Sequence, residues 1–316
     1  METIRRITVP TGDILIVKGF KGNLELLSIG DYGKDVNLSH RPVVHTDLLP
    51  LTDKWVITIS TQYGCSMNCT FCDVPKVGPG VNATFHDLTG QILTGLKLHP
   101  EITTTKRLNI HFARMGEPSW NPNVLECGKW IKEHLSDSFR CHPVVSTMMP
   151  RSNQWLKVFI HNWMRIKNRI FDGEAGLQLS INSTDESERR AMFHGNTCTL
   201  SEIKEIMTGI IPVGRKITLN FAIAGYIIDP DILLQWFSPE LYTCKLTPMH
   251  KTNTATMLGI KTDGDYTTPE PYEIIADKLM RAGYETLVFI ASKEEDESRI
   301  TCGNAILSGG ELPCGK

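Results

Sequence analysis

The sequence lacks any long apolar run. Nowhere do about 18 apolar residues follow one another, so it predicts no transmembrane helix. Residues 1–6 are not followed by the apolar stretch of a signal peptide, and we therefore expect a cytoplasmic protein with no membrane partner. An excess of one charge is also lacking, because 33 basic residues oppose 35 acidic ones and the formal net charge is −2. That balance excludes a global basic field for nucleic acid, although it is compatible with a local basic groove.

Cysteine is scarce. Nine cysteines in 316 residues, an odd number, do not form the dense framework of a disulfide-stabilised secreted protein, so a reducing compartment is expected. Internal repeats and low-complexity tracts are missing too. The remaining composition, 41% hydrophobic and 22% charged, is ordinary for a globular protein. A chain of this length can bury the core of one α/β barrel or of two modest domains.

Three of the cysteines nevertheless stand close together, at Cys65, Cys69 and Cys72, with CxxxCxxC spacing. Three such thiolates can bind three irons of a [4Fe–4S] cluster and leave one iron open, whereas ferredoxins fill all four positions. Radical S-adenosylmethionine (SAM) enzymes bind SAM at the open iron and cleave it to methionine and a 5′-deoxyadenosyl radical. A zinc site would normally need two separated ligand pairs, and no second pair accompanies the triplet. The triplet therefore predicts a [4Fe–4S] cluster, SAM, and an electron donor such as flavodoxin or ferredoxin.

Patterns typical of strands and helices alternate along most of the chain, which favours parallel βα units. Strands are predicted at 14–17, 24–27, 55–60, 108–112, 144–147, 177–181, 217–223, 244–247 and 286–290, and helices at 88–98, 124–135, 155–162, 201–210, 231–236 and 273–282. This order predicts an α/β fold, a partial (β/α)6 TIM-like radical SAM barrel with a small N-terminal β extension. The expected divisions are a β-rich extension at 1–45, the barrel at 46–307 and a flexible tail at 308–316.

Candidate site residues follow the predicted strands. Barrel active sites lie at the C-terminal ends of the strands, so these segments should converge on one mouth. They are the cysteine loop, the segment 115–118, Ser146, Asn182 and His250.

The segment 60–72 resembles the cluster loop of the RlmN/Cfr radical SAM methyl synthases, which methylate carbon 2 or carbon 8 of an adenosine in RNA. The resemblance covers residues from about 45 to 307 and continues in register. The matching segments are 115–118 with the family's MGEP motif, 145–147 with its serine-bearing strand, 179–182 with its Ser-Leu-His, 217–229 with a strand and loop, 246–250 with its LIPFN, and 300–303 with its C-terminal AACG.

The resemblance implies a SAM site. Gly116 and Glu117 would contact the methionine end of SAM, and Ser146, Ser180 and Asn182 its ribose and carboxylate. Asn182 replaces a histidine and His250 an asparagine that lie near SAM in the family. Without the resemblance, 116–118 reads equally well as a plain turn, and the two serines as hydroxyls that cap strand ends.

The resemblance also gives Cys302 a catalytic role. In the family this cysteine accepts a methyl group from one SAM, and a radical from a second SAM then activates that methyl for addition to adenine. A thiolate suits the role because it is a soft nucleophile that later leaves in a disulfide. The implied activity is an RNA adenine methyltransferase with tRNA or rRNA as partner, and we expect a monomer.

Several departures leave alternatives open. The family's second catalytic cysteine has Thr58 in its place, and no motif selects a substitute among Cys127, Cys141, Cys198, Cys244 and Cys314. The N-terminal region is also shorter than in the family, and the basic C-terminal tail is missing. One alternative is a radical SAM enzyme that acts on a nucleotide, small metabolite or peptide without a methylated cysteine. Another is a non-enzymatic iron–sulfur protein.

Overall fold

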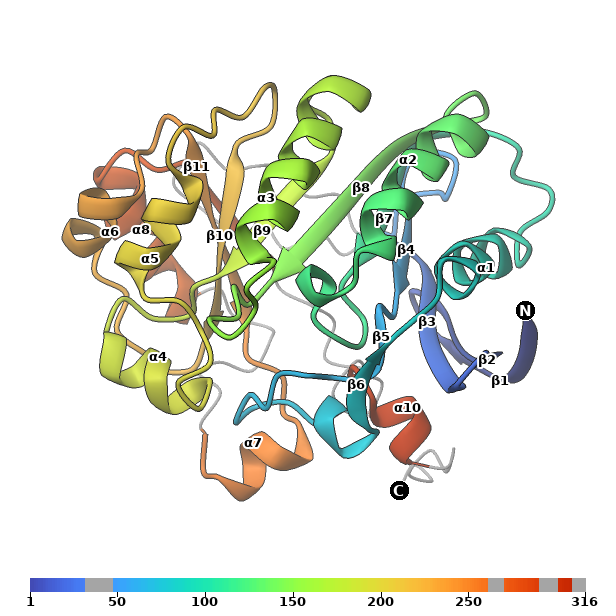
Figure 1. Ribbon diagram of the computed structural model, residues 1–316, viewed down its shortest axis with the longest axis horizontal. Helices are drawn as coiled ribbons and strands as arrows, with labels where there is room; N and C mark the ends of the chain where they lie inside the picture. The colour runs from blue at the N-terminus through green and yellow to red at the C-terminus, as the bar shows by residue number, and fades with distance from the viewer. Residues whose placement is uncertain (32–47, 261–269, 290–300, 309–316) are drawn as a thin grey trace.

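The structure, a computed structural model, describes residues 1–31, 48–260, 270–289 and 301–308 (Figure 1). Within these residues ten strands form one sheet in the order β1-β2-β3-β4-β7-β8-β9-β10-β11-β12. The strands are β1 (Glu2–Val9), β2 (Gly12–Gly19), β3 (Gly22–Gly30), β4 (Trp55–Ile59), β7 (Thr105–Phe112), β8 (Phe139–Thr147), β9 (Gly176–Ser180), β10 (Ile217–Ile223), β11 (Tyr242–Pro248) and β12 (Thr286–Val288). A separate hairpin pairs β5 (Gln62–Gly64) with β6 (Pro79–Asn82).

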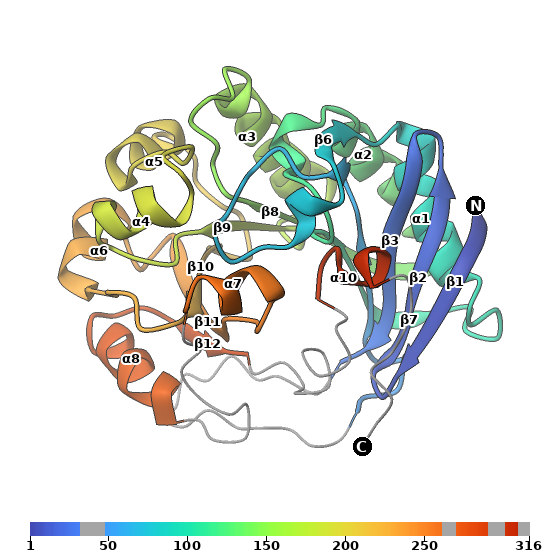
Figure 2. The ribbon, with the colours of Figure 1, turned by 90° about the horizontal axis from the view of Figure 1, so that it is seen from below.

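Within the ten-stranded sheet, β4 pairs in parallel with β7, and the strands from β7 to β12 also pair in parallel. β1 and β12 stand at the two edges of the sheet. The described strands therefore form an open barrel, which confirms the predicted fold class. Most of the helices cover the convex face of this sheet (Figures 1 and 2). The helices are α1 (Phe85–Leu96), α2 (Asn123–Leu135), α3 (Leu156–Arg165), α4 (Glu186–Met192), α5 (Leu200–Met207), α6 (Pro230–Trp236), α7 (Asn253–Met257), α8 (Glu270–Arg281) and α10 (Asn304–Leu307).

Every strand and helix predicted in the sequence is present, with shifted ends. The patterns missed β1, the β5–β6 hairpin and the short helices α4, α7 and α10. These helices have four to seven residues, too few to show a helical repeat of apolar positions. A π-helical turn, η3 (Ile166–Ile170), also continues α3 beyond its predicted end.

The N-terminal strands belong to the same sheet as the barrel. β3 pairs with β4 in antiparallel register, with Leu26 opposite Ile59. Trp55 Nε1 donates to Ser28 Oγ at 3.0 Å, which ties the two strands together through buried side chains. The pairing makes β1 to β3 an extension of the barrel wall.

The two faces of the parallel strands differ in chemistry. Along β10 the alternate residues Ile217, Leu219 and Phe221 are buried against the helices. Thr218 and Asn220 stand on the opposite, concave face. A closed TIM barrel fills its interior with bulky branched side chains, whereas this open barrel has a polar interior.

No helix in the described parts of the chain is long and apolar enough to cross a bilayer.

Candidate active site at the cysteine loop

The cysteine loop leaves the hairpin of β5 and β6 at the C-terminal end of β4. Gly64 has φ +76°, and a Cβ on it would stand 2.0 Å from the carbonyl oxygen of Gly78. A Cβ on Gly80 would stand 2.1 Å from the Ser66 nitrogen. Glycine is required at these two positions because the loop crosses the hairpin at backbone contact. Cys65 N then donates to Gly78 O at 3.2 Å, which fixes the start of the loop.

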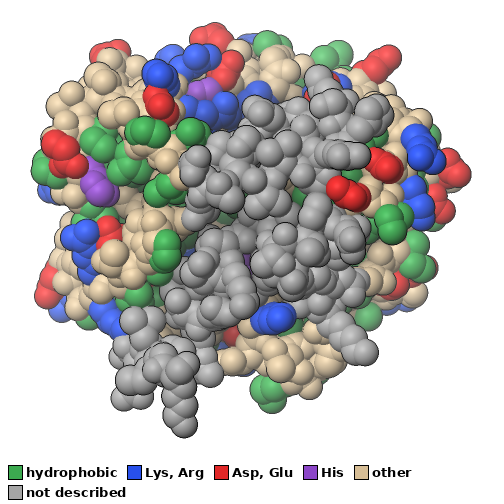
Figure 3. Space-filling view, turned by 180° about the vertical axis from the view of Figure 1, so that it is seen from behind, with side chains coloured by type: hydrophobic (Ala, Val, Ile, Leu, Met, Phe, Trp, Pro, Cys, Tyr) green, Lys and Arg blue, Asp and Glu red, His purple; other side chains and the backbone are tan. Residues whose placement is uncertain are grey.

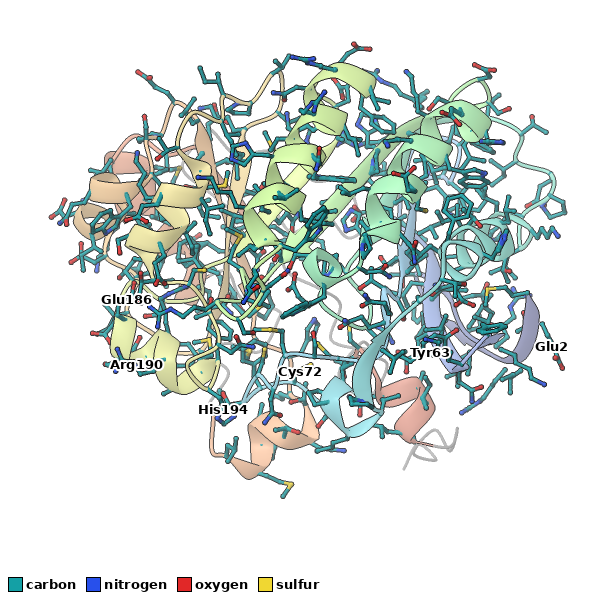
Figure 4. All side chains as sticks on the ribbon, viewed as in Figure 1. Glu2, Tyr63, Cys72, Glu186, Arg190 and His194 are labelled. Carbon is teal, nitrogen blue, oxygen red and sulfur yellow. The ribbon has the colours of Figure 1, made fainter. Side chains whose placement is uncertain are left out.

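All three loop thiols lie inward. Cys69 is buried, and Cys65 and Cys72 are half-buried. Figure 4 shows Cys72 at the lower end of the sheet, near α7. Burial raises the pKa of the Cys65 thiol to about 12 and those of Cys69 and Cys72 above the ordinary range, so three thiolates here require bound positive charge.

The donor set fits an iron–sulfur cluster. In the described part of the chain no three His, Cys, Asp or Glu side chains stand close enough together to hold a single metal ion. A cluster instead lets each thiolate of Cys65, Cys69 and Cys72 bind its own iron. The residues present therefore suit a cluster better than one zinc ion.

Cys302 lies beside this loop. Burial is the main reason that the Cys65 and Cys72 thiols have raised pKa values, and repulsion from Cys302 adds to it in both. Arg114 Nη1 lies 3.8 Å from the Cys302 Sγ, which in turn points at the carbonyl of Ala113 at 3.8 Å. A guanidinium beside sulfur favours the thiolate form.

A buried ion pair holds the segment that carries Cys302. Arg114 Nε donates to Glu25 Oε2 at 2.9 Å, and Arg114 Nη2 donates to Thr301 O at 3.2 Å. Glu25 also accepts hydrogen bonds from the backbone N–H groups of Gly303 and Ile306, both at 2.9 Å. This pair was not predicted from the sequence, although a charged residue inside the apolar run 24–27 is a usable signal.

Asp73 fastens two further segments to the cysteine loop. Its carboxylate accepts from the backbone N–H groups of Asn253 and Thr254 at 3.0 Å, and from Asn304 Nδ2 at 3.1 Å. Thr252 Oγ1 adds a bond of 2.7 Å to Phe71 O. As a result α7 and α10 flank the mouth of the barrel, which Figure 2 shows from below.

Glu117 and Gly116 line the same mouth, but the Glu117 carboxylate is already engaged. Thr147 Oγ1 donates to it at 2.6 Å, Met148 N at 2.8 Å and Ser119 N at 3.0 Å. Burial raises the pKa of Glu117, and these hydrogen bonds oppose the rise. Glu117 therefore fixes the end of β8, and its contact with SAM stays a prediction.

Gln62 joins the 115–118 loop to the cysteine loop. Its Oε1 accepts from Glu117 N at 3.0 Å and from Ser66 N at 3.2 Å. Gly116, with φ +93°, packs on Gln62 so tightly that a Cβ would stand 2.5 Å from the Gln62 Cβ. The sequence carried no sign of this role for Gln62.

The remaining predicted SAM contacts stand at strand ends around the mouth. Ser146 donates to Gln178 Oε1 at 3.3 Å, and Ser180 is half-buried at the end of β9. Asn182 is buried with φ +59°, and its Oδ1 accepts from Ala222 N at 3.0 Å, so this side chain links the ends of β9 and β10. His250 follows β11 and is half-buried. Their contacts with SAM stay predictions.

The other described cysteines are buried structural residues. Four of them pack in the hydrophobic core, namely Cys127, Cys141, Cys198 and Cys244. Burial raises the pKa of each thiol, to about 11 for Cys141 and Cys198, which makes all four unreactive. Cys314 lies outside the described residues. Thr58 stands on β4 opposite His111 of β7.

Comparisons with known proteins were made by sequence and by structure. No family model matches the chain. A probable RNA methyltransferase of Sorangium cellulosum is 23% identical over 184 residues, 57% of this chain and 43% of that protein. The dual-specificity RNA methyltransferase RlmN of Desulfosudis oleivorans is 40% identical over 85 residues, 27% of this chain and 22% of that protein.

A solved structure extends the likeness. The radical SAM methyltransferase of Sphaerobacter thermophilus superposes with a TM-score of 0.68 at 17% identity, over 96% of this chain and 80% of that one. The chain spans less than half the length of the two curated relatives above. The chain shares the fold of the Sphaerobacter thermophilus protein, and parts of its sequence are similar to RNA methyltransferases, RlmN among them.

Proposed function

We propose that this protein is a radical SAM methyltransferase that modifies an adenine-type base through a methylated Cys302. The observation that carries the proposal is the position of Cys302 beside the cysteine loop, with the Arg114 guanidinium 3.8 Å from its sulfur. A [4Fe–4S] cluster on Cys65, Cys69 and Cys72, together with SAM, would supply the reductive cleavage that generates a 5′-deoxyadenosyl radical.

The chain's own residues would prepare the thiol and hold it in place. Arg114 stabilises the thiolate that Cys302 forms when its proton goes to solvent. The sulfur would then bond to the methyl group of SAM as the methyl–sulfonium bond breaks, with S-adenosylhomocysteine as the leaving group. Glu25 forms hydrogen bonds to both Arg114 and the 301–308 segment, and these bonds keep the Cys302 sulfur at the mouth of the barrel. Gly116, Glu117, Ser146, Ser180, Asn182 and His250 are the proposed SAM contacts.

The substrate proposed first is an adenosine of RNA, with flavodoxin or ferredoxin as electron donor. The relatives named as RNA methyltransferases support this choice. In Figure 3 acidic and basic side chains are interspersed over the described part of one face, so no continuous basic patch covers it. RNA binding would then depend on local contacts rather than on a broad field.

A second candidate is the same chemistry on a free nucleotide. The polar, cation-lined interior of the barrel favours it, because a phosphate-bearing small molecule would fit there.

The experiment that tests the proposal is mass spectrometry of the protein after anaerobic incubation with SAM. We expect one added methyl group on Cys302, and loss of methylated product in Cys302→Ala with iron content and 5′-deoxyadenosine formation retained. Cys198→Ala, which removes a thiol from the core, is the matched control and should keep methylation. Active enzyme with an unmethylated Cys302 would falsify the proposal. Comparison of cellular RNA with and without the protein then tests the RNA substrate.

A further inference from the structure

The polar interior of the barrel contains a cavity of about 400 Å³. Its lining includes residues that lie just before the strands, such as Lys54 before β4, Lys216 before β10 and Glu285 before β12. The cavity therefore reaches the N-terminal ends of the strands, whereas the cysteine loop lies at their C-terminal ends. Cavities of this size accommodate small-molecule ligands.

Positive charge dominates the cavity wall. In the described lining five lysine and arginine side chains face three carboxylates. Two of these carboxylates are neutralised by neighbours, since Asp31 pairs with Lys54 at 2.6 Å and Glu285 with Lys216 at 2.7 Å. The third, Glu174, pairs with Arg140 and contacts His142, both outside the lining. Three cations are left over, Arg107, Arg215 and Lys245.

These three cations interact with neutral groups. Arg107 Nε donates to Asn109 Oδ1 at 3.1 Å, and Arg215 Nη1 donates to the backbone carbonyl of Glu174 at 3.2 Å. Lys245 Nζ lies over the Phe289 ring, 4.8 Å from its centroid. Among the described residues no carboxylate forms an ion pair with any of the three.

Arg215 lies close enough to both Arg107 and Lys245 for the charges to repel. Burial, followed by repulsion from Arg107, lowers the pKa of Arg215 to about 10, although the Glu174 carboxylate attracts both guanidinium groups without forming an ion pair with either. Burial also lowers the pKa of Lys245 to about 8; attraction from Asp31 opposes this shift, and weaker repulsion from Lys54 and Arg215 adds to it. A cluster of this kind is costly unless an anion joins it.

The backbone leaves room for this cluster. A Cβ on Gly176, the first residue of β9, would stand 3.1 Å from Val144 Cγ2 and 3.4 Å from Arg215 Nη1. A larger residue here would press on Val144 and would stand in van der Waals contact with the Arg215 guanidinium.

We propose that this cavity binds the phosphate of a nucleotide-sized molecule through Arg107, Arg215 and Lys245. Guanidinium groups match phosphate oxygens in pairs, and an ammonium adds a point charge. Gln178 lines the cavity and accepts a hydrogen bond from Ser146, a predicted SAM contact, at 3.3 Å. We take this nucleotide to be the substrate of the cysteine-loop site, and only in this respect does the inference rest on the proposed function.

Calorimetric titration with AMP, inorganic pyrophosphate and adenosine tests the inference, without SAM or reductant. We expect AMP and pyrophosphate to bind, and adenosine to bind at least roughly tenfold more weakly than AMP, because it lacks the phosphate. Lys245→Met and Arg215→Gln should each weaken AMP binding roughly tenfold or more and leave adenosine unchanged. Lys157→Met, an exposed lysine on α3, is the matched control and should not change AMP affinity.

Equal affinity for AMP and adenosine, no saturable AMP binding, or unchanged AMP affinity in Lys245→Met would each overturn the inference. If Lys245→Met fails to fold, Arg107→Gln replaces it, because its described hydrogen bond is only to Asn109. AMP binding is measured without catalytic turnover, so the proposed phosphate site and the proposed methylation of Cys302 can be refuted independently. Cys302→Ala should keep full AMP affinity even if Cys302 proves not to be methylated.

Discussion

At the scale of single residues, buried charge is the feature with the largest energetic consequences. Arg114 and Glu25 are both nearly inaccessible, with side-chain exposures of 4% and 0%. Their mutual attraction offsets the cost of removing both charges from water only while both partners are present. Each is therefore sensitive to loss of the other.

Arg114→Met should destabilise the protein by about 3–5 kcal/mol, because it leaves the Glu25 carboxylate buried without its cation. Urea unfolding measures the change. The double variant Arg114→Met, Glu25→Gln should recover part of the loss, since no charge then stays unpaired. Lys129→Met, which breaks an exposed pair with Glu126, is the control and should unfold like the wild type. Equal stability of wild type and Arg114→Met would contradict the assigned role of the pair.

His142 gives the fold a pH dependence. Burial, with repulsion from Arg107, Arg215 and Arg140, lowers its pKa to about 3. The imidazole is therefore neutral at pH 7, and its 3.2 Å approach to Glu174 Oε2 is not an ion pair.

The unfolded chain binds a proton on His142 near its ordinary pKa of about 6.5, whereas the folded chain does not until about pH 3. Stability from this residue is thus lost as pH falls below about 6.5, by about 1.4 kcal/mol for each pH unit. His142→Gln should flatten this slope in urea unfolding between pH 7 and 4. His134→Gln, at an exposed histidine, should leave the slope as it is. An unchanged slope in His142→Gln would rule out this source of acid sensitivity.

At the scale of elements, the mouth depends on short segments that side chains hold in place. α7 and α10 have five and four residues, too few to be stable helices alone. Asp73 bonds to both, and Glu25 holds α10 from the other side. The two helices are therefore held in place by their contacts with Asp73 and Glu25 rather than by their own helical hydrogen bonds.

Asp73→Ala should release both segments, because four donors lose their acceptor at once. We expect faster amide hydrogen exchange in 252–258 and 301–308, with little change in the strands. Asp185→Ala, which removes the N-cap of α4, is the matched control and should raise exchange only near α4. Unchanged exchange in both segments would show that other contacts hold them.

At the scale of the whole molecule, α10 packs against the N-terminal strands of the ten-stranded sheet. Ala305 of α10 packs against Ile7, Val9, Ile14 and Ile16 of β1 and β2. Since Cys302 stands next to this helix, the N-terminal strands help to place the candidate catalytic thiol. The predicted division at residue 45 falls outside the described residues and stays a prediction.

The shared sheet should unfold as one unit. Leu26→Ala, a fully buried residue of β3, should lower the free energy of unfolding by about 2–5 kcal/mol for the entire protein. Tryptophan fluorescence and circular dichroism should give one coincident transition. Phe20→Ala, at an 82% exposed residue between β2 and β3, should change neither. Two separate transitions would show that the N-terminal strands unfold independently of the barrel.

The sequence by itself determined the cysteine triplet, the order of the long elements and the barrel class. These features can be predicted locally, because ligand spacing and the alternation of apolar residues involve positions that are close together in the sequence. Only the tertiary structure decided that Glu25, Arg114 and Cys302 meet, since 89 and 188 residues separate Arg114 from the other two. It also decided that Arg107, Arg215 and Lys245 share one cavity. Such long-range contacts depend on how the strands curve into an open barrel, which no local pattern specifies.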